Sequence, residues 1–98
     1  MPIKFTSHDT QITPVLRQLI EEKFARIQRH CSNNIMHAEV ILKTENVTHT
    51  AEINAHISGA EFNAQANDKD LYKAIDIMMQ KLNKQVLKHH EKSINHQI

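Results

Sequence analysis

Three segments of the chain alternate between apolar and polar residues, and this alternation constrains the fold more than any other feature. It is cleanest over residues 47–58, where Val, His, Ala, Ile, Ala and Ile occupy one set of positions and mostly polar residues occupy the other. Residues 36–43 and 60–66 repeat the pattern. Because side chains alternate between the two faces of a β-strand, each segment is predicted to be a strand with one buried and one wet face.

Two other segments carry apolar residues every three or four positions, which is the period of a helix. Thr13 and Pro14 are a favourable N-cap and first residue for a helix that is expected to end at residues 31–34. A longer helix is predicted over residues 68–91, capped by Asn67 and Asp68. Its predicted core stripe is Leu71, Ala74, Ile75, Met78, Leu82 and Val86.

The predicted element order is β-α-β-β-β-α, beginning with a short strand over residues 1–8. A four-stranded sheet that is wet on one face, with both helices covering the other face, buries every apolar stripe at once. The first helix is a crossover that allows the first two strands to be parallel, and the short later connections predict antiparallel pairs. We therefore expect one α+β domain over residues 1–98, built as a two-layer sandwich.

Composition argues against several classes of protein. No apolar run is long enough to cross a membrane, no signal peptide is visible, and the lone Cys31 cannot form an internal disulfide, so a cytoplasmic protein is expected. No nucleophile motif or Gly-rich phosphate loop is present, so neither an enzyme nor a cofactor is expected. His89 and His90 point about 100° apart on a helix, which disfavours a metal site.

Regularly spaced cations on both predicted helices point to an anionic partner. The net charge is only +1, but Glu91 is the only acid between Lys81 and Ile98. Lysines on an amphipathic helix usually just face water, whereas uncompensated cations one turn apart (about 5.4 Å) suit a phosphate backbone. The candidate RNA-binding residues are Lys23, Arg26, Arg29, Lys81, Lys84, Lys88 and Lys92.

Three stretches of the chain resemble the bacterial ribosome hibernation promoting factor family. They are ITPVLRQLIEEKFARIQ, VTHTAEINAHISGAEFNAQA and DLYKAIDIMMQKLNKQVLKHHEK, and together they span nearly all of the sequence. The most specific piece is D-x-Y-x-A-I-D, residues 70–76, followed by K-L-x-x-Q-x-x-K-x-x-x-K, residues 81–92. The resemblance implies the same β-α-β-β-β-α sandwich and is closest to the short form of the factor.

The resemblance also implies a function. Family members bind the small ribosomal subunit and its 16S rRNA at the decoding region, across the mRNA channel and the A and P sites. They silence translation in stationary phase and stress, and the short form promotes inactive ribosome dimers together with the ribosome modulation factor. The seven candidate cations are then expected to contact rRNA phosphates. Asp70 and Asp76 are weaker candidates, since the first favours a helix N-terminus and the second suits plain solvation.

Two other functions remain open from the residues alone. A general double-stranded RNA-binding module also places two helices on a small sheet. A protein-interaction module would dimerise through the polar sheet face, but Thr48, Thr50, Asn54 and Ser58 give that face little apolar area. A monomer in solution is therefore expected. Tyr72 is interpreted either as a ring at the edge of the core or as an RNA contact.

Overall fold

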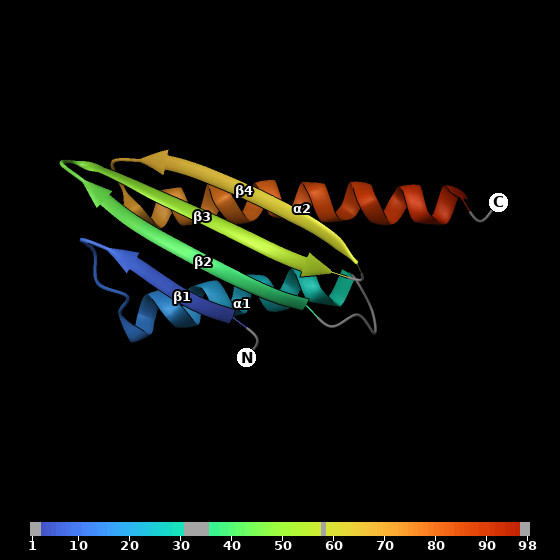
Figure 1. The fold of residues 1–98 in the computed structure, drawn as a ribbon, viewed down its shortest axis with the longest axis horizontal. Coiled ribbons are helices and arrows are strands. Elements are labelled where there is room, and N and C mark those ends of the chain that lie inside the picture. Colours follow the sequence, from blue (N-terminus) through green and yellow to red (C-terminus); the bar gives the residue numbers. More distant parts are fainter. Residues whose placement is uncertain (1–2, 31–35, 58, 97–98) are drawn as a thin grey trace.

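The structure, a computed structural model, describes residues 3–30, 36–57 and 59–96 (Figure 1). The predicted order β-α-β-β-β-α is confirmed. The elements are β1 (Ile3–His8), α1 (Pro14–His30), β2 (Met36–Glu45), β3 (Thr48–Ile57), β4 (Ala60–Asp68) and α2 (Leu71–His96). The predicted end of the first helix at residues 31–34, and residues 1–2 and 58 of the predicted strands, lie outside the described residues.

The four strands form one sheet in the order β1-β2-β3-β4. β1 pairs with β2 in parallel, through the crossover helix α1, and the two later pairs are antiparallel, as the lengths of the connections predict. The register aligns Phe5, Val40, Ile53 and Ala64 in one row across the sheet. Val40 and Ile53 are fully buried, so this row faces the core.

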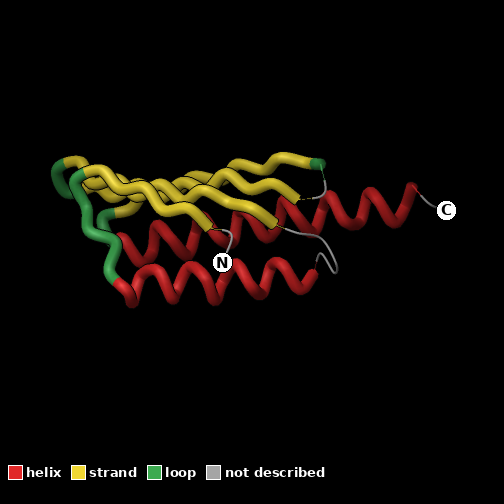
Figure 2. Tube along the Cα trace, turned by 60° about the horizontal axis from the view of Figure 1, so that its bottom comes forward, coloured by secondary structure: helices red, strands yellow, loops and turns green. Residues whose placement is uncertain are grey.

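Both helices cover the same face of the sheet, and they run in the same direction (Figures 1 and 2). α2 packs against β3, β4 and α1. The core draws on every apolar stripe, with Phe24 of α1 and Leu82 of α2 fully buried against the sheet. The other face of the sheet is polar, which confirms the predicted two-layer sandwich. Neither helix, over its described residues, contains an apolar stretch able to span a bilayer.

The start of α1 is built as predicted. Thr13 Oγ1 accepts a hydrogen bond from the backbone N–H of Leu16 at 3.1 Å, and the Thr13 carbonyl accepts one from Arg17 N at 3.0 Å. Pro14 is the first helical residue, where its missing N–H costs nothing. The Leu16 N–H, one of the free donors at the helix end, therefore has a partner, and the Thr13 carbonyl accepts the first intrahelical bond.

The predicted start of α2 is wrong by three residues. Asp68 is the last residue of β4, where it is held in register with His49 of β3. Asp70 is the N-cap instead: its Oδ1 accepts from Tyr72 N at 2.9 Å and its carbonyl from Ala74 N at 3.0 Å. Strand pairing thus extends β4 through the residues that sequence alone assigned to the helix. At its other end α2 continues to His96, beyond the predicted end at residue 91.

The turn between β2 and β3 also differs from the prediction. Val47 was expected on the core face, but its side chain is 68% exposed because it lies in the turn itself. Asn46 has a φ of 58°, a conformation that Asn tolerates better than most residues. β2 is accordingly longer than predicted and ends at Glu45, which pairs with Thr48, whereas β3 begins one residue later than predicted.

Candidate nucleic-acid interface

Two sets of contacts fix which way each flank of α2 faces. On one flank, Asp76 Oδ1 accepts from the Lys23 ammonium of α1 at 2.9 Å. On the other, Lys81 Nζ donates to the Gln65 carbonyl of β4 at 2.8 Å, and the Gln85 side-chain amide caps a second carbonyl of that edge strand at 2.8 Å. α2 therefore presents one flank to α1 and the opposite flank to the outer edge of β4.

Three predicted lysines form one row on the β4 flank of α2. Lys84 and Lys88 follow Lys81 at three- and seven-residue spacing, which places all three side chains on one side of the helix. All three are exposed. Within the described residues, Lys84 and Lys88 have no ion pair or hydrogen bond, and the Lys81 ammonium binds a neutral carbonyl. We call Lys81, Lys84 and Lys88 the α2 lysine row; the Lys92 side chain lies outside the described residues.

The other predicted cations do not join this row. Lys23 and Arg26 lie on α1 beside a groove between the helices with a volume of about 250 Å³. We call this the interhelical groove; it is lined by Lys23, Arg26, Ile27, Asp76, Met79, Gln80 and Asn83. Arg29 is exposed one turn further along α1, on the part of the surface next to Arg26. The six candidates whose side chains the structure describes thus occupy two separate flanks of the helix layer.

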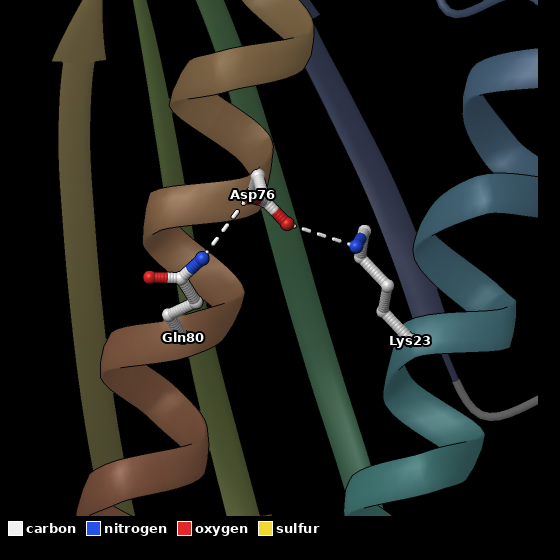
Figure 3. Close-up of polar contacts among 3 residues, drawn as sticks. All are labelled: Lys23, Asp76 and Gln80. Carbon is white, nitrogen blue, oxygen red and sulfur yellow. Dashed lines mark hydrogen bonds and ion pairs between the residues drawn. The ribbon is translucent and has the colours of Figure 1, made fainter.

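Lys23 is held by a carboxylate (Figure 3). Asp76 Oδ1 contacts its ammonium, and Asp76 Oδ2 accepts a hydrogen bond from the Gln80 side-chain amide at 3.0 Å. The Lys23 side chain is only 26% exposed and lines the groove together with Ile27 and Met79. Asp76 is therefore an ion-pair partner of Lys23, a contact that the sequence did not predict. The sequence separation of 53 residues between the partners hides this pair from any local pattern.

The sequence did not single out some polar residues of the helix layer that the structure places near the candidate cations. Gln80 and Asn83 bring two side-chain amides to the groove. Their helical spacing from Asp76 is the sequence signal from which this position could have been predicted. Arg17 is engaged elsewhere, with its guanidinium 5.0 Å from the centre of the Phe5 ring. Tyr72 is half exposed in the first turn of α2, which fits either a ring at the edge of the core or an RNA contact.

The open sheet face offers no stacking platform within the part of the chain that the structure describes. Phe24 is fully buried, while Phe5 and Phe62 pack against the core. Phe62 also meets the His89 ring edge-on, with centroids 5.4 Å apart. In the same part of the chain, no group of three His, Cys, Asp or Glu side chains is arranged to hold a metal ion. The chemistry on offer is charge and hydrogen bonding on the helix layer.

Comparisons with known proteins agree with this architecture. A sequence model of the family described as "Sigma 54 modulation protein / S30EA ribosomal protein" matches residues 3–94. The chain is 38% identical to a protein from Azotobacter vinelandii named "Ribosome hibernation promoting factor", with 99% of this chain and 90% of that protein covered. It is 36% identical to the protein of the same name from Escherichia coli K12, with 98% and 100% covered. That name is not the name of an enzyme.

Solved structures share the fold. The N-terminal domain of Protein Y from Thermus thermophilus superimposes with a TM-score of 0.83 at 30% identity, covering 91% of this chain and 99% of that one. A ribosomal subunit interface protein from Coxiella burnetii gives 0.82 at 32% identity, covering 93% and 99%. The matches in sequence and in structure both extend over nearly the whole length, and the chain therefore belongs to the Sigma 54 modulation protein / S30EA ribosomal protein family.

Proposed function

We propose that this protein binds the ribosome and holds it in a translationally silent state. The family membership supports this function. Two relatives whose names refer to ribosome hibernation support it too, since the match covers 90% or more of the length of each. The observation that carries the proposal is the α2 lysine row. Its exposed ammonium groups have no acidic partner among the described residues, so the structure leaves them available for an external polyanion.

The partner surface in this proposal is 16S rRNA of the small subunit, at the decoding region across the mRNA channel and the A and P sites. Lys84, Lys88, Arg29 and Lys92 contact phosphates, and Lys81 shares its ammonium between RNA and the Gln65 carbonyl. Each phosphate contact releases condensed counterions, which makes the affinity steeply dependent on salt. Such contacts position the protein without selecting a sequence.

Silencing in this account needs only shape and charge. The molecule measures about 50 × 22 × 18 Å, with α2 running along its length (Figure 2). A rod of that size, bound in the mRNA channel, occludes mRNA and tRNA sterically and needs no reactive group. We further propose that the bound form favours inactive ribosome dimers when the ribosome modulation factor is also present.

Sucrose-gradient sedimentation with purified ribosomes tests the proposal. The protein is expected to co-sediment with small subunits and whole ribosomes at low salt, to dissociate as salt rises, and to increase the dimer peak only with the modulation factor. Free double-stranded RNA serves as the competitor. Equal affinity for plain duplex and for ribosomes would instead support a general double-stranded RNA-binding module.

A further inference from the structure

We propose that the interhelical groove binds one unpaired guanine base of the RNA, while the α2 lysine row holds the backbone. This inference rests on the proposed function and adds a base-specific contact to it. It starts from a difference between the two flanks of α2. The row offers only cations, whereas the groove combines a carboxylate, an ammonium, a guanidinium, two side-chain amides and apolar side chains.

Asp76 supplies a fixed pair of acceptors. Each carboxylate oxygen has two lone-pair sites, and each oxygen uses one of them, Oδ1 for Lys23 and Oδ2 for Gln80. One site on each oxygen is left, and the two neighbours hold the carboxylate in a single orientation (Figure 3). Two adjacent acceptors in one plane are complementary to the N1–H and N2–H donors of guanine. Adenine and cytosine do not present two adjacent donors of this kind.

Arg26 supplies matching donors from the facing helix. Its guanidinium is exposed at the groove and has no ion pair among the described residues. Arginine donates two parallel hydrogen bonds to the O6 and N7 acceptors of guanine. The groove therefore offers acceptors from α2 and donors from α1, and guanine carries both complementary sets of groups on its edges.

The floor of the groove suits a flat ring more than a phosphate. Ile27 and Met79 line it and are 4% and 3% exposed, and a thioether makes favourable contacts with aromatic rings. The groove holds one carboxylate and two cations, and the charge of Lys23 is already offset by Asp76, so a phosphate would find little excess positive charge there. The volume of about 250 Å³ lies just under the range of about 300–1,000 Å³ for drug-sized ligands, which fits a single base.

Titration of the full chain with guanosine 5′-monophosphate, followed by amide NMR shifts, tests the inference. The expected shifts fall on the side-chain amides of Gln80 and Asn83 and on neighbouring backbone amides. Inosine 5′-monophosphate, which lacks the N2 amino group, is expected to bind several-fold more weakly, and adenosine 5′-monophosphate more weakly still. Inorganic phosphate is expected to leave these amides unshifted. Equal shifts with all three nucleotides, or shifts with phosphate alone, would overturn the inference.

Matched variants separate this inference from the proposed function. Asp76→Asn replaces one acceptor by a donor at constant size, and it is expected to weaken guanosine 5′-monophosphate binding about tenfold, as loss of one bidentate pair does. Thermal melting confirms that this variant is folded. Lys84→Glu/Lys88→Glu is expected to lose ribosome binding and keep the nucleotide shifts. If the native chain binds ribosomes but no nucleotide shifts the groove amides, the guanine site is rejected while the proposed function stands.

Discussion

The two flanks of α2 carry cations in opposite circumstances. On the flank facing α1, Lys23 is half-buried and bound to Asp76 at 2.9 Å. On the flank facing the edge of β4, Lys84 and Lys88 are exposed and meet no acid within the described residues. A cation bound to a carboxylate is already neutralised, whereas a free cation can neutralise a phosphate and release the counterions condensed on the RNA. The number of cations therefore matters less than how the fold pairs them.

This difference also separates two kinds of contact with RNA. A row of ammonium groups follows a backbone whatever its sequence, but a groove with fixed donors and acceptors discriminates between bases. Placing the two on opposite flanks of one helix lets a single rigid element carry both. Substitutions that unfold α2, and substitutions on one flank alone, test that division.

Leu82→Asp is expected to have the largest effect. Leu82 is fully buried between the flanks, and an unpaired carboxylate there lacks any hydrogen-bond partner. We expect loss of more than about 4 kcal/mol of stability, which is a large share of the about 5–15 kcal/mol that a native domain possesses. Circular dichroism during thermal unfolding measures it. A cooperative transition near that of the native protein would show that α2 does not depend on this core.

Lys84→Glu/Lys88→Glu is expected to abolish co-sedimentation with ribosomes while the fold remains. Both residues are exposed, so the substitutions reverse two phosphate contacts without burying charge. The matched control is Lys4→Glu/Lys43→Glu, which makes the same charge change at two exposed lysines on the open sheet face. The control is expected to retain binding. Equal loss in both variants would mean that total charge, and not the α2 lysine row, drives association.

Single neutralisations within the row are expected to act unequally. Lys84→Gln should make the slope of log affinity against log salt less steep by about 0.7–0.9, the value for one phosphate contact. Lys81→Gln should change it less, because the Lys81 ammonium already donates to the Gln65 carbonyl. Binding to small subunits, measured by fluorescence anisotropy at four salt concentrations, compares the two. A larger change for Lys81 would place the RNA against the β4 edge instead.

Removing the groove ion pair is expected to have the smallest effect on the salt dependence. Lys23→Gln/Asp76→Asn keeps the net charge and removes the ion pair between the two helices. Because Lys23 is already neutralised, the slope of log affinity against log salt should not change, although the affinity itself falls with the loss of the guanine acceptors. A slope reduced as much as that of Lys84→Gln would show that Lys23 leaves Asp76 to bind phosphate.

Periodicity was sufficient to predict the element order, the two layers and most of the core. Alternation placed Ala51, Ile53 and Ala55 on the buried face, and helical spacing placed Leu82 in the core. It failed at the ends of elements, where pairing decides. Asp68 is a good helix cap in isolation, but its register with His49 makes it part of a strand. A local signal cannot include a partner nineteen residues away.

The candidate interface was predicted in part for the same reason. Helical spacing correctly placed Lys81, Lys84 and Lys88 on one side of a helix, because that relation is local. The partner of Lys23 lies on another helix, and so does the groove that the two helices enclose. Which cations are neutralised depends on how α1 and α2 pack, and a pattern within either helix does not contain that information.

The most direct test of the central claim is the salt dependence of binding to isolated small subunits, with large subunits as the control. The five proposed phosphate contacts, from Arg29, Lys81, Lys84, Lys88 and Lys92, predict tight binding at low ionic strength and a log–log slope of about −4. Binding to large subunits is expected to be much weaker. No binding to small subunits at low ionic strength, or an affinity that does not change with salt, would contradict the account.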